Sequence, residues 1–202
     1  MMSPIKVFNS WVLNGKDEGM EKNHSVAVNK MIDMLIRKSS KKFSFIDAGC
    51  GNGWVIRKMN LETLCSYSVG VDGSNNMIDK AKKIDPTGNY VCSDLIKWKP
   101  EEKVDYVHSM EVLYYFENPS KLLKHIYDFW LKKNGTIVVG VDFYKENKIS
   151  HSWPASLNTT MTLLSKKEWL NCFKQSGFSN VEIFQVNPSN DFKGTLVIKG
   201  NS

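Results

Sequence analysis

The sequence contains no long hydrophobic run and no closely spaced pair of cysteines. No apolar stretch approaches the roughly 20 residues that a membrane-spanning helix needs, and the N-terminal segment MMSPIKVFNSW lacks the apolar core of a secretory signal. The four cysteines, Cys50, Cys65, Cys92 and Cys172, form neither a Cys-x-x-Cys pair nor a zinc motif with histidine. Scattered single cysteines are typical of a reducing compartment, so we expect a cytoplasmic protein with no membrane anchor.

Internal repeats and low-complexity segments are also absent. Of the 202 residues, 42% are hydrophobic and 24% are charged, which excludes a disordered chain and fits one globular domain. The net charge of +6 would permit nucleic-acid binding, but the lysines are spread out and form no dense stripe with interleaved aromatic residues. We therefore expect a small-molecule partner rather than nucleic acid, and a monomer or homodimer.

Short runs of strand-forming residues alternate with helical patterns after residue 43. The runs lie at residues 43–46, 67–71, 90–92, 104–108 and 136–141. Helical spacing of apolar residues follows at 55–60, 75–83 and 120–131. This alternation predicts a largely parallel sheet with helices on both faces.

The C-terminal part of the chain changes character. Ser165 and Glu168 have the spacing of a capping box, which predicts a helix that runs through Gln175. Two strands are expected at 181–186 and 194–199, joined by a loop of turn-forming residues. Such a hairpin makes the last strand antiparallel to its neighbour.

Residues 1–42 precede the first predicted strand and form an N-terminal helical extension to the main domain, residues 43–202. Apolar residues at helical spacing predict an amphipathic helix at 25–37. The polar segment 15–24 before it is either an exposed linker or a lid over a pocket. Trp11, Met20 and His24 are unusual choices for a linker, and they make a lid an equally good interpretation.

The stretch FIDAGCGNGW places three glycines, Gly49, Gly51 and Gly53, directly after the first predicted strand. Glycines at this point of an α/β sheet let the backbone approach a ligand closely. A dinucleotide fingerprint would need glycine at the position of Trp54. Asp47 would repel a pyrophosphate and attract an ammonium group, so the pattern favours a ligand with a cationic end.

Two further acids follow the next two predicted strands. Asp72, in the sequence GVD, has the spacing of an acid that binds ribose hydroxyls. Asp94, in CSDL, ends the third strand and could reach an adenine amino group. Aspartate is common after strands as a turn or cap residue, but that reading weakens when three acids end successive strands of one sheet.

With these residues the sequence resembles the class I S-adenosylmethionine-dependent methyltransferases. The resemblance runs from about residue 43 to the C-terminus and is carried by FIDAGCGNG, GVD, SD, VDYVHSME and LKKNGTIVV. It implies a Rossmann-like, seven-stranded, mostly parallel sheet with helices on both faces and an antiparallel last strand. It also implies S-adenosylmethionine as the cofactor.

The resemblance assigns roles to the residues that match. The glycine loop would face the methionine part of the cofactor, Asp72 would hold the ribose, and Asp94 with Leu95 would flank the adenine. The expected cofactor-binding residues are Asp47, Gly49, Cys50, Gly51, Gly53, Asp72, Gly73, Met77, Ser93, Asp94, Leu95, Ser109 and Met110. At Cys50 we favour a small residue in a tight turn over a nucleophile.

The sequence indicates fewer residues for binding the methyl acceptor than for binding the cofactor. His24 and His151 are the candidate catalytic bases, whereas His108 is expected in the core and His125 in solvent. The candidate substrate-binding residues are Trp11, Met20, Tyr114, Tyr115, Tyr144 and Trp153. The irregular stretch 143–161 is expected to help shape the acceptor pocket.

The segment EVLYYFENP resembles a segment of quinone-biosynthesis O-methyltransferases that reads Glu-x-x-Glu-His. Tyr114 and Tyr115 replace its second Glu and its His, which removes oxygen and nitrogen ligands for a cation. We therefore predict no metal site.

Together these features predict an enzyme that methylates an O or N atom of a small molecule. Two alternatives stay open: a methyltransferase of RNA or protein, which the positive charge allows, and a non-catalytic nucleoside-binding module. A nicotinamide oxidoreductase ranks behind them, because Trp54 breaks the required glycine spacing.

Overall fold

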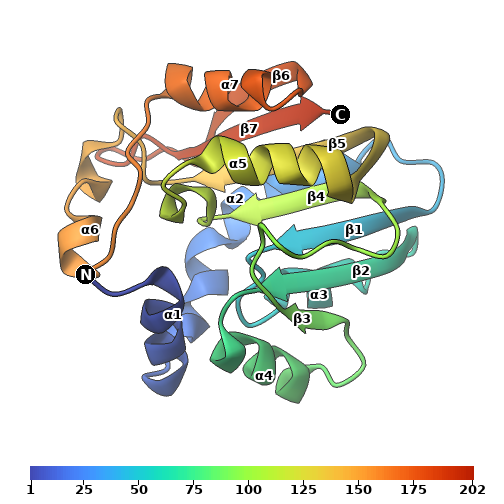
Figure 1. Ribbon diagram of the computed structural model, residues 1–202, viewed down its shortest axis with the longest axis horizontal. Coiled ribbons are helices and arrows are strands. Elements are labelled where there is room, and N and C mark those ends of the chain that lie inside the picture. The colour runs from blue at the N-terminus through green and yellow to red at the C-terminus, as the bar shows by residue number, and fades with distance from the viewer.

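The computed structural model describes residues 1–202, and its centre is one seven-stranded sheet (Figure 1). The strand order is β3-β2-β1-β4-β5-β7-β6. The strands are β1 (Phe43–Ala48), β2 (Cys65–Asp72), β3 (Tyr90–Cys92), β4 (Val104–Met110), β5 (Leu131–Val141), β6 (Ser179–Val186) and β7 (Thr195–Asn201). Strands β1 to β5 pair in parallel, and β7 runs antiparallel to both β5 and β6. The predicted Rossmann-like sheet with an antiparallel last strand is confirmed.

Helices cover both faces of the sheet. They are α1 (Pro4–Leu13), α2 (Gly19–Ile36), α3 (Trp54–Met59), α4 (Asn75–Ile84), α5 (Pro119–His125), α6 (Trp153–Ser156) and α7 (Lys166–Gln175). Buried side chains of α5 and α7 pack on one face, and those of α2, α3 and α4 pack on the other, so the core has two halves (Figure 1). None of these helices is both long and apolar enough to cross a membrane.

The helix starts follow from local capping chemistry. The capping box at α7 is present as predicted: the Ser165 hydroxyl accepts from the Glu168 N–H, and the Glu168 carboxylate accepts from the Ser165 N–H. Helix α1, which sequence analysis did not predict, begins at Pro4 with Ser3 as its N-cap.

The segment 15–24 is ordered rather than a linker. It forms a short 3-10 turn at residues 16–18 and the first turns of α2, which begins six residues earlier than the predicted helix. Asp17 is fully buried and pairs with Lys80 of α4 at 2.8 Å between Nζ and Oδ2. Its carboxylate also accepts from the side-chain amide of Asn52. The linker interpretation is therefore wrong, because this polar segment finds its hydrogen-bond partners in the main domain.

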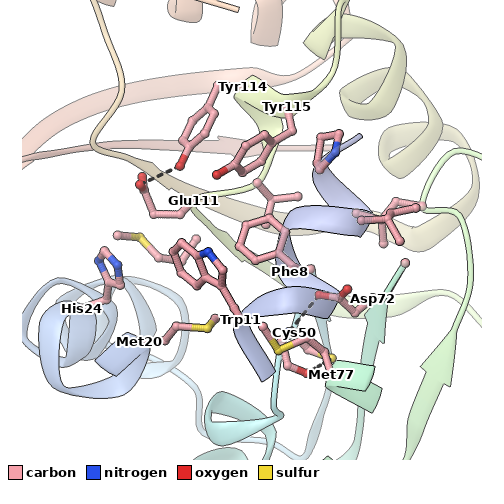
Figure 2. A pocket seen from close by; sticks show the side chains of 18 of the residues that line it. Phe8, Trp11, Met20, His24, Cys50, Asp72, Met77, Glu111, Tyr114 and Tyr115 are labelled. Atoms are coloured by element: carbon pink, nitrogen blue, oxygen red, sulfur yellow. Dashed lines mark hydrogen bonds between the residues drawn. The ribbon is translucent and has the colours of Figure 1, made fainter. Parts of the chain in front are cut away.

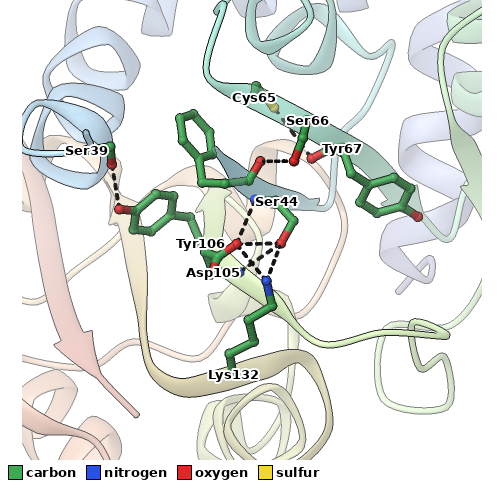
Figure 3. Close-up of polar contacts among 9 residues, drawn as sticks. Ser39, Ser44, Cys65, Ser66, Tyr67, Asp105, Tyr106 and Lys132 are labelled. Atoms are coloured by element: carbon green, nitrogen blue, oxygen red, sulfur yellow. Dashed lines mark hydrogen bonds and ion pairs between the residues drawn. The ribbon is translucent and has the colours of Figure 1, made fainter. Parts of the chain in front are cut away.

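A polar network fixes the amino ends of the central strands, at the edge opposite their carboxyl ends (Figure 3). One carboxylate oxygen of Asp105 accepts from the Ser44 N–H at 2.8 Å, from the Ser44 hydroxyl at 2.7 Å and from the Lys132 ammonium at 2.9 Å. These bonds join β1, β4 and β5. Burial alone would raise the pKa of Asp105, but the hydrogen bonds from Lys132 and Ser44 outweigh it and hold the pKa below its ordinary value.

We expect Asp105→Asn to lower the free energy of unfolding by about 1 kcal/mol at pH 7, since the ammonium and hydroxyl lose a charged acceptor and the side chain is partly solvent-screened. A lowered folded pKa stabilises the protein above the unfolded pKa of about 3.9, and this contribution is lost as the pH falls through the folded value. The difference between wild type and variant in urea denaturation should therefore shrink below about pH 4. Asp191→Asn, in the exposed loop before β7, is the matched control. If Asp105→Asn lowers the free energy of unfolding no more than the control does, the network does not stabilise the fold.

Candidate active site

One large cavity opens at the carboxyl ends of the parallel strands, with a volume of about 730 Å³. Its floor is formed by residues that follow β1, β2, β4 and β5. Helix α1 and residues 153–157 contribute the opposite wall. Figure 2 shows α1 carrying Phe8 and Trp11 into this space. The volume lies within the roughly 300–1,000 Å³ that is usual for small-molecule sites.

The glycine loop after β1 needs its glycines for backbone conformation. Gly49, Gly51 and Gly53 have φ angles of 79°, 53° and 80°, in the left-handed region that other residues rarely adopt. A Cβ on Gly51 would also lie 2.7 Å from the Met20 methyl carbon across the cavity. The loop can turn here, and its bare backbone forms part of the cavity wall.

Asp72 links this loop to the end of β2. Its carboxylate accepts from the Gly51 N–H at 2.9 Å and from the Ser74 N–H at 2.8 Å. Burial raises the pKa of Asp72, although both backbone bonds oppose this effect. A carboxylate has about four lone-pair positions, so Asp72 retains acceptor capacity toward the cavity that it lines.

Asp47 is held by a partner that sequence analysis assigned only to the core. His108 is completely buried as expected, but it also lines the cavity, and its Nδ1 lies 2.7 Å from Asp47 Oδ1. This contact fixes the Asp47 carboxylate at the end of β1.

Cys50 is 2% exposed, and burial together with the nearby Asp72 and Asp47 carboxylates raises the pKa of its thiol well above the ordinary value. The thiolate needed by a nucleophile is thus strongly disfavoured. This supports the interpretation of Cys50 as a small packing residue.

A second polar cluster, which we call the Glu111 cluster, consists of Glu111, Tyr114, Asp142 and His24. The Glu111 carboxylate accepts from the Asp142 N–H and, at 2.8 Å, from the Tyr114 hydroxyl. His24 Nδ1 lies 3.8 Å from Asp142 Oδ2. Sequence analysis named Glu111 only within a motif and missed Asp142. The available signal was the one used for the other acids, since Asp142 directly follows β5.

The cluster is electrostatically strained. Burial, and then the neighbouring Asp142, raise the pKa of Glu111 well above its ordinary value. Burial also raises the pKa of Asp142, against smaller opposing effects from Thr195 and His24. Burial lowers the pKa of His24, with Asp142 opposing, so the imidazole is neutral at pH 7 and can accept a proton.

The cavity brings together most of the predicted site residues. Those that line it are Trp11, Met20, His24, Asp47, Gly49, Cys50, Gly51, Asp72, Gly73, Met77, Asp94, Leu95, Met110, Tyr114, Tyr115 and Trp153. As expected, the stretch 143–161 contributes to the wall, through Trp153, Ser156 and Leu157.

Five predicted site residues lie outside the cavity lining. Tyr144 is fully buried and donates its hydroxyl to the Gly194 carbonyl, so it is a core residue. The Ser109 hydroxyl points to the Ala48 carbonyl within the sheet. His151 is exposed, with its ring nitrogen 3.1 Å from the Lys145 carbonyl oxygen.

The other two residues outside the lining are Gly53 and Ser93. Gly53 forms the N-cap of α3 and faces the ring of Tyr90 rather than the cavity. Ser93 lies beyond the edge strand, where its N–H bonds to the Asp72 carbonyl. Neither residue lines the cavity.

Comparison with known proteins identifies this architecture. The family described as "Methyltransferase domain" matches residues 20–183, which is most of the chain. The chain belongs to the class I S-adenosylmethionine-dependent methyltransferases. S-adenosylmethionine is accordingly its cofactor.

The similar structures agree with the fold of this methyltransferase. A complex of the Haloferax volcanii Trm112 methyltransferase activator with a methyltransferase contains a chain that is 26% identical, with a TM-score of 0.85 and 96% of both chains covered. The N-methyltransferase NodS from Bradyrhizobium japonicum, solved with S-adenosylhomocysteine, is 14% identical with a TM-score of 0.67, covering 86% of this chain and 84% of NodS. The latter likeness shows the fold alone.

The curated relatives match more weakly in sequence. Trans-aconitate 2-methyltransferase of Klebsiella pneumoniae is 23% identical over 125 residues, which is 62% of this chain and 46% of the relative. The Escherichia coli O1:K1 protein of the same description is 26% identical over 96 residues, or 47% and 38% respectively. The methyltransferase thus matches less than half the length of these relatives.

We expect Asp72→Ala to weaken binding of S-adenosylhomocysteine by more than tenfold, or about 1.4 kcal/mol, because the ribose hydroxyls lose their acceptor. Calorimetric titration measures this effect. The variant also removes the hydrogen bond between Asp72 and the glycine loop, so circular dichroism checks that the fold stays intact. Asp79→Ala, at an exposed position of α4, is the matched control. Unchanged affinity in a folded Asp72→Ala protein would refute the ribose assignment.

Glu111→Gln should stabilise the methyltransferase at pH 8 by on the order of 1 kcal/mol, since it removes a buried charge, keeps an acceptor oxygen for the Asp142 N–H and lets the new NH2 group donate to the Tyr114 hydroxyl oxygen. A carboxyl whose folded pKa exceeds its unfolded value loses stability as the pH rises through that interval. The advantage of the variant in thermal melts should therefore shrink as the pH falls toward 4.5. The exposed Glu117→Gln provides the comparison. A destabilised Glu111→Gln protein at pH 8 would show that the carboxylate is retained for structure.

Proposed function

We propose that this methyltransferase transfers the methyl group of S-adenosylmethionine to a small-molecule acceptor. The observation that carries the proposal is one continuous cavity with two chemically different ends. The glycine loop, Asp72 and Asp94 line one end, whereas the Glu111 cluster and several aromatic rings line the other. Figure 2 shows Asp72 and Glu111 on opposite sides of Trp11. Two reactants held in such a cavity can meet in line, and positioning supplies much of the rate enhancement.

The first end fits the cofactor. The Asp72 carboxylate would accept hydrogen bonds from the ribose hydroxyls, and Asp94 with Leu95 would flank the adenine. The left-handed glycine loop would let the amino-acid part approach the backbone. When bound, the cofactor supplies a methyl carbon activated by its sulfonium sulfur, and the protein supplies orientation and a dry environment.

The contacts that hold the N-terminal segment against the main domain favour a small acceptor over RNA or protein. Asn9 of α1 accepts from the Ser74 hydroxyl at 2.6 Å, which fixes α1 against the start of α4. The Met2 N–H donates to the Asn158 carbonyl, and the Met2 carbonyl accepts from the Thr159 hydroxyl. We propose that α1, the first helix of the N-terminal extension at residues 1–42, acts as the lid over the reactants.

His24 is the proposed base. Its imidazole lies in the cavity wall beside Asp142, and its lowered pKa leaves it neutral at pH 7. In that state it can take the proton that an acceptor oxygen or nitrogen must lose. His151, the other candidate, is exposed outside the lining and is not assigned a role.

Calorimetric titration of the purified protein with S-adenosylmethionine, S-adenosylhomocysteine and NAD tests the proposal. We expect micromolar binding of both sulfur compounds and none of NAD. Binding should release heat in proportion to protein concentration and should weaken in Asp72→Ala. Failure of both sulfur compounds to bind would remove the basis of the proposed function.

A further inference from the structure

Two carboxyl groups of the cavity have no role in holding the cofactor. Glu111 follows β4 and Asp142 follows β5, and both line the cavity. They are adjacent because β4 and β5 pair in parallel. The Asp142 N–H donates to the Glu111 carboxylate. Two acids held this closely at one end of a cavity need an explanation, because mutual repulsion disfavours the arrangement.

The backbone at Glu111 supports a functional reason. Its φ angle is 59°, in the left-handed region that is unfavourable for a residue with a side chain. The Glu111 N–H donates to the Gly140 carbonyl at 2.9 Å, and the Tyr114 hydroxyl donates to its carboxylate, so the position is fixed on both sides. The surrounding structure thus holds a strained acid at the cavity wall.

Asp142 supplies the second, independent observation. It is only 7% exposed, and its Oδ1 has no hydrogen-bond partner. A buried carboxylate oxygen without a donor is destabilising, and such groups are rare in folded proteins. The polar groups near the Asp142 carboxylate are His24, whose Nδ1 lies 3.8 Å from Oδ2, and the side chain of Thr195. A donor from a ligand in the cavity would satisfy the free oxygen.

The charges around the cavity indicate which kind of donor fits. Five carboxyl residues line it, Asp47, Asp72, Asp94, Glu111 and Asp142, and no lysine or arginine does. The whole chain contains 27 Lys and Arg residues against 21 Asp and Glu residues, so composition does not explain this absence. The two histidines of the lining, His24 and His108, each face one of the acids, and Lys97, outside the lining, lies 3.9 Å from Asp94. A cation is the ligand that balances the remaining negative charge.

Aromatic rings form the walls next to the Glu111 cluster. The Phe8 ring lies 5.2 Å from that of Trp11 and 5.3 Å from that of Tyr115, in edge-to-face contacts. Figure 2 shows these three rings between Glu111 and Asp72. The faces of Trp and Tyr attract cations, and the rings exclude water, which strengthens the pairing with a carboxylate.

We propose that Glu111 and Asp142 form an ammonium-binding subsite, so that the methyl acceptor is the nitrogen of an amine. This inference rests on the proposed function and selects nitrogen over oxygen as the acceptor atom. It also means that the acceptor of this chain differs from trans-aconitate, the substrate in the name of its curated relatives. Trans-aconitate is a tricarboxylate, and it would find five acids and no lysine or arginine along this cavity.

The chemistry balances with the residues present. The bound ammonium gives one proton to the neutral His24 imidazole, which leaves a lone pair on nitrogen. That nitrogen forms a bond to the methyl carbon while the carbon–sulfur bond breaks, and the bonding pair stays on sulfur. The product is a methylated ammonium ion, whose charge the two carboxylates continue to balance, and a neutral thioether.

Calorimetric titration of the protein saturated with S-adenosylhomocysteine tests the subsite without requiring turnover. The probes are 2-phenylethylamine and 3-phenylpropionate, which share an aromatic ring but differ in charge, and trans-aconitate. We expect the amine to bind at least tenfold more tightly than 3-phenylpropionate and trans-aconitate to show no binding. The methyl group of labelled S-adenosylmethionine should then appear on the amine.

Variants distinguish binding at the subsite from non-specific binding elsewhere in the cavity. Glu111→Gln and Asp142→Asn should each reduce amine affinity at least fivefold while S-adenosylhomocysteine affinity stays within twofold, and Glu117→Gln should change neither. Equal or tighter binding of either carboxylate, or no binding of the amine by a protein that binds S-adenosylhomocysteine, would overturn the inference. If the wild-type protein does not bind S-adenosylhomocysteine, that result would instead refute the proposed function.

Discussion

The hydrogen bonds between the glycine loop and the end of β2 are the constraint on which the site depends. The N–H groups of Gly49 and Cys50 both donate to the Val71 carbonyl, and that of Gly51 donates to Asp72. These bonds hold the loop after β1 against the end of β2. Glycines adopt the left-handed turns that result without steric cost. The loop therefore presents bare backbone beside an acid, as the proposed binding of the cofactor requires.

The same parallel sheet also concentrates negative charge. Parallel strands end at one edge, so an acid after each strand adds to a single cavity, as Asp47, Asp72, Glu111 and Asp142 do. No lysine of this basic chain lines the cavity, and Lys97 pairs with Asp94 from outside the lining. Burial then raises the pKa values of Glu111 and Asp142, which is a cost in stability that a cationic ligand would offset. The network around Asp105 at the opposite edge shows the contrasting case, in which Lys132 lowers the pKa of a structural acid.

The N-terminal extension joins the site to the rest of the fold in two ways. Helix α2 packs its apolar face against the sheet and belongs to the core, whereas residues of α1 line the cavity. Asp17 holds the turn between them through Lys80 and Asn52, the latter from the glycine loop itself. If α1 acts as the proposed lid, the contacts of Asn9 and Met2 are the ones that its opening would break.

The sequence by itself determined the sheet, the antiparallel last strand, the α7 capping box and the glycine loop and strand-end acids that line one end of the cavity. These features depend on local patterns: alternation of strands and helices, glycine spacing, and acids at strand ends. The tertiary structure decided what local pattern does not encode. It showed that α1 covers the cavity, that Tyr144 and Ser109 turn into the core, and that His108 holds Asp47. Asp142 and Glu111 became a pair only through the register of β4 and β5. Side-chain direction and contacts between distant segments follow from packing of the whole chain, and no single segment specifies them.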